Sequence, residues 1–257
     1  MFKTNREEKL CQNLILIGLL ILGICYADIT QAGDFLLVFA GAGMQIPLDK
    51  IGKQFEEEYR VKVAYDYEGS GRLGNKILAG QRPDVFIPGG EKWAKLLREK
   101  GYVKAYWPIA YHIPVIITPP NNTKVKNLVD FMKKDVRLVL GDGKACAIGR
   151  IESCIFKKAN LDETKMNVLA KGVTVKQLVY WIEGKNADAS IVWRADAIQS
   201  GGKIRTVFIP KEINCIEIIP VCEINKALHP KMAKKYINYL FVKGKLIFKK
   251  MGFKVAE

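Results

Sequence analysis

The chain has 257 residues, of which 49% are hydrophobic and 26% are charged, and its formal net charge is +15. This length and hydrophobic content exclude a disordered chain and allow one or two domains with a sizeable core. The basic residues are scattered through expected helices and turns, a pattern that favours solubility, attraction to anionic membranes and steering of small anions over nucleic-acid binding.

The first 33 residues are predicted to be a signal peptide or an N-terminal membrane anchor. A charged start at Lys3–Lys9 precedes the apolar run Leu14–Cys25, which is shorter than the roughly 20 residues that span a membrane. Ala27 offers a small residue for cleavage, and Cys25 only loosely resembles a lipoprotein acceptor site. We therefore expect an exported protein, periplasmic or on the cell surface, with anchoring through this segment or through Cys25 left open.

Two glycine turns follow the signal segment, each at the point where a strand pattern gives way to a helical pattern. The first glycine turn, residues 41–43, follows the apolar run Phe35–Ala40, and the second, residues 69–71, follows the alternating run Val61–Tyr65. A helix start leaves about four backbone N–H groups unpaired and carries the positive end of the helix dipole. Because glycine lets this backbone come close to a ligand, both turns are predicted anion sites.

The remaining patterns alternate between strand and helix, which predicts an α/β protein. In the first α/β set we expect a helix at 72–80, a strand at 84–88 and a helix at 91–100. The second set is expected to contain strands at 113–118, 137–140 and 189–193, a loop at 141–147, and helices at 149–159, 175–183 and 195–200. The chain then leaves the second set through residues 203–210 and 215–222. This alternation predicts mostly parallel sheets with helices on both faces, arranged as two similar-sized lobes. Ligands in such folds bind beyond the carboxyl ends of the strands.

The second glycine turn also matches a nucleotide-binding pattern. Gly69 to Gly74 reads G-x-G-x-x-G, and Glu91 lies at the distance of a ribose partner. The helix that it opens is short, however, and the motif follows the second strand of the lobe rather than the first. A dinucleotide site is therefore kept as the less favoured alternative to an anion-binding turn.

Residues for catalysis and metal binding are sparse. The two histidines, His112 and His229, lie outside any recognisable nucleophile motif. Asp142 and Glu152 form a possible carboxylate pair, although nothing in the sequence fixes their separation. We expect a binding protein and no enzyme, with an exported enzyme acting on phosphate or sulfate esters as the alternative.

The cysteines beyond the signal segment are expected to be structural. Cys146, Cys154, Cys215 and Cys222 are even in number, so an oxidising compartment would allow two disulfides with three possible connectivities. Their spacings match no zinc signature. We therefore expect no metal.

Several stretches resemble the substrate-binding proteins of molybdate and tungstate ABC transporters. They are LLVFAGAGM, VKVAYDYEGSGRLGNKILAGQRPDVFIPGG, LVLGDGKACAIGR, ASIVWRADAI and KYINYLFVKGKLIFKKMGF. The resemblance covers nearly all of the chain after the signal segment. It implies a two-lobed, class II periplasmic-binding-protein-like fold with a ligand cleft between the lobes. Residues 34–111 would form the first part of lobe 1, residues 112–219 lobe 2, and residues 220–257 the return segment and C-terminal helices that complete lobe 1.

The same resemblance implies the ligand contacts: Gly43 and Ser70 in the first lobe, and Ile148, Val175 and Trp193 in the second. The family's usual serine is Gly43 here and its usual tyrosine is Trp193, whereas Ile148 and Val175 would act through backbone N–H groups. The ligand would be molybdate or tungstate, with sulfate or phosphate as the alternative, no cofactor would be needed, and the partner would be a membrane permease. A monomer is expected.

Two of these positions have a second interpretation. Ser70 could instead cap the helix that follows it, and Trp193 could be a packing residue at a strand end. Cys146 occupies the loop position where some archaeal relatives carry an acidic metal contact, so no such carboxylate is expected here.

Overall fold

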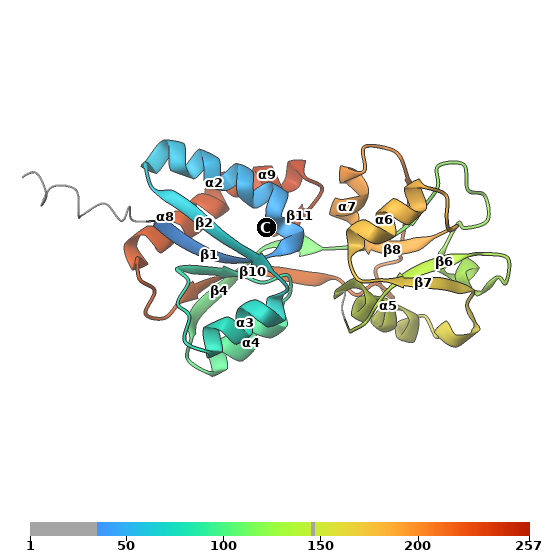
Figure 1. Ribbon diagram of the computed structural model, residues 1–257, viewed down its shortest axis with the longest axis horizontal. Coiled ribbons are helices and arrows are strands. Elements are labelled where there is room, and N and C mark those ends of the chain that lie inside the picture. Colours follow the sequence, from blue (N-terminus) through green and yellow to red (C-terminus); the bar gives the residue numbers. More distant parts are fainter. Residues whose placement is uncertain (1–34, 145–146) are drawn as a thin grey trace, which may run out of the picture.

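The structure is a computed structural model that describes residues 35–144 and 147–257. The predicted export segment and Cys146 lie outside the described residues. Two lobes, each with its own sheet and helices, are joined by extended segments that run between them (Figure 1). No helix within the described ranges is both long and apolar enough to cross a membrane.

The first lobe is built on a six-stranded sheet in the order β11-β4-β10-β3-β1-β2. Its strands are β1 (Phe35–Gly41), β2 (Lys62–Glu68), β3 (Val85–Ile87), β4 (Val103–His112), β10 (Glu217–Ile224) and β11 (Lys254–Val255). β1 pairs in parallel with β2 and β3, whereas β10 is antiparallel to both β3 and β4, and β11 is antiparallel to β4. The sheet is therefore mixed, and the prediction of a mostly parallel sheet is wrong. The reason is that β4 leads out of this lobe and β10 returns beside it in the opposite direction.

Helices cover both faces of this sheet. They are the 3₁₀ turn η1 (Ala42–Met44), α2 (Gln45–Tyr59), α3 (Ser70–Leu78), α4 (Glu91–Glu99), α8 (Pro230–Tyr239), the π-helical turn η4 (Leu240–Gly244) and α9 (Lys245–Lys250). Leu36, Val38 and Ala40 of β1 face the core under α2, α8 and α9, and Phe39 faces the core under α3 and α4 (Figure 1). The period of two along β1 thus buries apolar side chains on both faces, at roughly 1.5–3 kcal/mol for each large one.

The second lobe has β5 at the centre of a three-stranded antiparallel sheet, with a parallel pair beside it. Its strands are β5 (Pro114–Thr118), β6 (Leu138–Gly141), β7 (Val168–Gly172), β8 (Ser190–Trp193) and β9 (Arg205–Phe208), and its helices are η2 (Leu128–Met132), α5 (Ala147–Lys158), η3 (Glu163–Lys165), α6 (Val175–Glu183) and α7 (Arg194–Gln199). A parallel bridge between Leu138 and Ala189 links the two parts. This lobe is mixed as well, because β5 enters it from the first lobe against the direction of β8.

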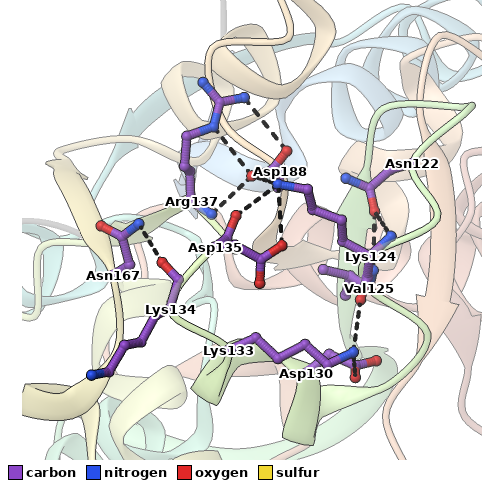
Figure 2. A network of polar contacts seen from close by, with 10 residues as sticks. All are labelled: Asn122, Lys124, Val125, Asp130, Lys133, Lys134, Asp135, Arg137, Asn167 and Asp188. Atoms are coloured by element: carbon purple, nitrogen blue, oxygen red, sulfur yellow. Dashed lines mark hydrogen bonds and ion pairs between the residues drawn. The ribbon is translucent and has the colours of Figure 1, made fainter.

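A polar network holds a loop-rich part of the second lobe, as Figure 2 shows. Asp188, which is 8% exposed, accepts hydrogen bonds from the backbone N–H of Arg137 at 2.9 Å and from its guanidinium. Although burial acts to raise it, these bonds and the nearby Lys124 hold the pKa of Asp188 below its ordinary value. The charged groups around Asp188 are thus paired with one another, which indicates a structural role for them.

One disulfide joins Cys154 of α5 to Cys215, which precedes β10. Cys222 is a free thiol, fully buried in the first lobe's core with Phe39 and Phe86. Two disulfides, which the even cysteine count would have allowed, are therefore excluded, and Cys154, Cys215 and Cys222 have the structural role expected of them. Because β10 carries Cys222 into the first sheet, that thiol is held among apolar side chains.

The chain crosses between the lobes twice, along neighbouring strands. It leaves the first sheet after His112 and enters the second at Pro114, and it returns through Glu217. Glu217 pairs with His112 in the antiparallel register of β10 and β4. The two crossing segments are therefore side by side, and His112 marks the junction.

Candidate functional site

The first glycine turn ends β1 and opens α2 at the junction of the lobes. At Gly41 a Cβ atom would lie 3.0 Å from Met44 Cε and 3.1 Å from the backbone nitrogen of Gly89, so close packing favours glycine there. At Gly43 the nearest atom to a Cβ would be Cε1 of His112 at 3.8 Å, and this glycine is not among those with a positive φ. Gly43 is thus required neither by close packing nor by its backbone conformation, and it leaves space beside His112.

Ser70 is the first residue of α3, and its side chain bonds to another loop rather than to its own helix. The Ser70 Oγ accepts a hydrogen bond from the Gly89 N–H at 2.9 Å. The residue at the N-cap is Gly69, and no side chain caps the helix. The interpretation of Ser70 as a helix cap is therefore wrong. Because Oγ acts as the acceptor in this bond, its own proton stays available to a ligand.

His112 lies between these two glycine turns and the second lobe. Its side chain is 5% exposed, and its ring centroid is 4.7 Å from that of Trp193 and 5.6 Å from that of Phe253. Its Nε2 would be 3.7 Å from a Cβ on Gly89. Burial lowers the pKa of His112 to about 4, so the imidazole is neutral at pH 7. From the sequence His112 was weighed only as a possible catalyst, because its position beside Gly43, Gly89 and Trp193 arises from tertiary packing.

Trp193 reaches the same point from the second lobe. It is the last residue of β8, pairs with Pro114 of β5 and is 7% exposed. The following residue, Arg194, donates its backbone N–H to the carbonyl of Ile113 at 2.8 Å. Strand pairing beside the crossing segment thus brings Trp193 onto the His112 ring. The structure thereby gathers three of the predicted positions, Gly43, Ser70 and Trp193, around His112.

Ile148 and Val175 lie at helix starts within the second lobe. Ile148 is the second residue of α5, with its side chain fully buried in the lobe core. Val175 opens α6, whose capping uses the N–H groups of Val173 and Gln177. As the first residue of α6, Val175 has a backbone N–H with no partner within its own helix. No described contact joins these two positions to Ser70, so their part in the site stays a prediction.

The turn between β6 and α5 is tightly packed. A Cβ on Gly149 would clash with the Gly141 carbonyl oxygen, so the end of β6 and the first turn of α5 are in close backbone contact. The buried Glu152 accepts a hydrogen bond from the Gly141 N–H at 2.8 Å. Burial raises the pKa of Glu152 well above its ordinary value. Asp142, the other member of the suggested carboxylate pair, accepts from the Lys144 N–H. Both carboxyl groups thus support this turn through backbone bonds, as structural residues do.

Two opposite charges and an open groove lie on the α5 side of the junction. Burial raises the pKa of Glu217, and the nearby Arg150 of α5 counteracts this effect. A groove of about 640 Å³ runs beside them, lined by Arg150, Ile151, Cys154, Lys158, Lys211, Asn214, Cys215, Ile216 and Glu217. Because Arg150 belongs to the second lobe and Glu217 to the first sheet, their attraction acts between the lobes.

The lobes also touch through α7. Ala195 of α7 packs in the first lobe's core, and Gln199 donates its amide to the Met251 carbonyl at 3.3 Å. Gly252, with φ of +90°, passes so close that a Cβ there would lie 2.8 Å from Ile198. In the described parts of the chain, no group of three or more His, Cys, Asp or Glu side chains is placed to hold a metal ion.

Residues 36–254 match the family model described as bacterial extracellular solute-binding protein. The chain belongs to this family. It is 30% identical to a putative binding protein of Haemophilus influenzae over 183 residues, which are 70% of this chain and 74% of that protein. It is 26% identical to the molybdate-binding protein ModA of the same organism over 233 residues, 87% of this chain and 90% of ModA.

Solved structures show the same fold. The substrate-binding domain of a putative molybdenum ABC transporter from Clostridium difficile superposes with a TM-score of 0.76 at 24% identity, covering 88% of this chain and all of that chain. The predicted family resemblance and the two-lobed periplasmic-binding fold are thereby confirmed.

Proposed function

We propose that this protein captures a tetrahedral oxyanion, with molybdate or tungstate favoured, and delivers it to the membrane permease of an ABC transporter. The observation that carries the proposal is the position of Gly43, Ser70 and Trp193 around His112 at the junction between the lobes. The molybdate-binding name of the relative ModA supports the choice of ligand.

The chemistry would rest on neutral hydrogen-bond donors. A dianion that is buried between lobes loses its hydration, and each hydrogen bond to a charged group contributes about 1.5–3 kcal/mol net. The Ser70 hydroxyl, the Trp193 indole N–H and the N–H groups at the starts of α5 and α6 are donors of this kind. Sulfate and phosphate share the tetrahedral geometry and are the alternative ligands.

A site between the lobes would couple ligand binding to recognition by the permease. A ligand that contacts both lobes stabilises only the closed form, which a permease can then distinguish from the open one. We propose export of the chain and action as a monomer. No residue combination described above supplies an activated nucleophile, so binding without turnover is proposed in preference to ester hydrolysis.

Addition of molybdate or tungstate is expected to raise the melting temperature of the purified protein. A ligand at a hundred times its Kd adds about 2.7 kcal/mol to the free energy of unfolding. A thermal melt with each of molybdate, tungstate, sulfate and phosphate, at matched ionic strength with chloride as the control, measures the shift. The absence of a shift with all four oxyanions would contradict the proposed function.

Ser70→Ala is expected to weaken oxyanion binding by roughly ten- to a hundredfold, because it removes a donor to a buried charged ligand. Calorimetric titration of the variant and of the unaltered protein measures the difference. Ser200→Ala is the matched control, since that hydroxyl donates to the Ala197 carbonyl near the end of α7. Unchanged affinity in Ser70→Ala would remove Ser70 from the site.

A further inference from the structure

His112 combines burial with an unpartnered nitrogen. Its Nδ1 is buried and bonds to no described residue. A buried polar atom without a partner costs about 1–3 kcal/mol, so its presence calls for a physical explanation. The other histidine, His229, differs in this respect, because its ring bonds to the buried Asp84 at 3.1 Å.

The His112 ring borders the space that Gly43 leaves open. Cε1 faces Gly43, and Nε2 faces Gly89, which also bonds to Ser70. Rotation of the ring by half a turn exchanges Nε2 with Cε1 and Nδ1 with Cδ2. Nε2 is the nitrogen nearest these turns in either orientation, since it lies beside Gly89 as placed and would lie beside Gly43 after the rotation, while the tilted ring contact with Trp193 persists.

Resting on the function proposed above, we propose that His112 contacts the ligand directly and donates an N–H to the oxyanion in place of the side-chain donor that Gly43 lacks. A neutral imidazole carries one N–H and one acceptor nitrogen. The imidazole N–H supplies the hydrogen bond to the oxyanion that a hydroxyl at position 43 would make. Because His112 also contacts Trp193, formation of this hydrogen bond is coupled to closure of the second lobe over the ligand. His112 is therefore a specificity-determining residue as well as part of the junction.

A set of variants in the full-length protein tests this assignment. His112→Phe keeps an aromatic ring beside Trp193 but has no nitrogen, whereas His112→Gln keeps an N–H donor. His229→Asn is the control, because it alters the other histidine away from the junction. By calorimetric titration with molybdate, His112→Phe is expected to lose roughly ten- to a hundredfold in affinity, His112→Gln less, and His229→Asn less than about threefold.

A substitution at position 43 tests whether His112 replaces the donor that Gly43 lacks. Gly43→Ser fits without strain, since its φ is not positive and no atom lies closer than 3.8 Å to the added Cβ. In the His112→Phe background this change is expected to restore at least about tenfold in affinity, and to give a smaller gain when His112 is present. Equal gains in molybdate affinity with and without His112 would overturn the proposal that His112 replaces a side-chain donor at position 43.

A measurement without any variant keeps the proposal testable if His112→Phe fails to fold. The chain has two histidines, so ¹⁵N-histidine labelling yields two imidazole signal sets. Molybdate is expected to shift the nitrogens of His112 and to leave those of His229 in place. Oxyanion binding with unmoved His112 signals, or with equal affinity in His112→Phe, would overturn this inference alone. No binding of any oxyanion by the unaltered protein would overturn it together with the proposed function.

Discussion

Reduction of the Cys154–Cys215 disulfide is expected to lower the free energy of unfolding by about 2–4 kcal/mol. The bond joins residues that are 61 positions apart. In the unfolded chain it closes a long loop and so removes conformations that the reduced chain regains. It also fixes α5 to the segment that returns to the first lobe. Its loss therefore affects the junction as well as the second lobe.

Denaturant titrations with and without reductant measure this effect. The double variant Cys154→Ser/Cys215→Ser is the control: its stability should match that of the reduced protein and should not respond to reductant, because Cys222, the remaining cysteine of the described residues, is a buried free thiol. A full-strength response to reductant in the double variant would contradict the assignment. So would unchanged stability of the unaltered protein after release of two thiols.

Gly74→Ala is expected to destabilise the fold by about 1–3 kcal/mol or more. A Cβ at Gly74 would lie 2.1 Å from Cε3 of Trp93 and 2.6 Å from Cδ2, so the body of the indole ring fills its place. To remove this steric clash, either the Trp93 ring or α3 must move away from the core that α3 and α4 cover. The gain of up to about 1 kcal/mol in helix propensity offsets only part of this cost.

Gly71→Ala, three residues earlier in the same helix, is the matched comparison. Its Cβ would make ordinary contacts with Trp93 at 3.7 Å or more, so this change should be neutral or slightly stabilising. Thermal and denaturant unfolding of both variants measure the difference. Equal stabilities would show that Trp93 does not pack on Gly74. The result also bears on the G-x-G-x-x-G pattern, because ring packing alone accounts for its last glycine.

Much of this fold was predictable because its signals are local. The run from Phe35 to Ala40 alternates sides of a doubly covered sheet, and each glycine turn follows a strand and begins a helix. These features depend on backbone geometry and on periodicity, which neighbouring residues determine. The family resemblance and the two-lobed fold followed from the same stretches.

The sequence by itself therefore determined many of the strands and helices, the two glycine turns and the family, whereas β4 and β7 were not predicted. Only the tertiary structure decided which strands run antiparallel, that Cys154 pairs with Cys215, that Ser70 bonds to Gly89, and that His112 meets Trp193. Each of these depends on two segments that are distant in the chain and meet only when the crossing strands pair. No local pattern encodes such a meeting, because it arises from packing the whole chain around the junction of the lobes.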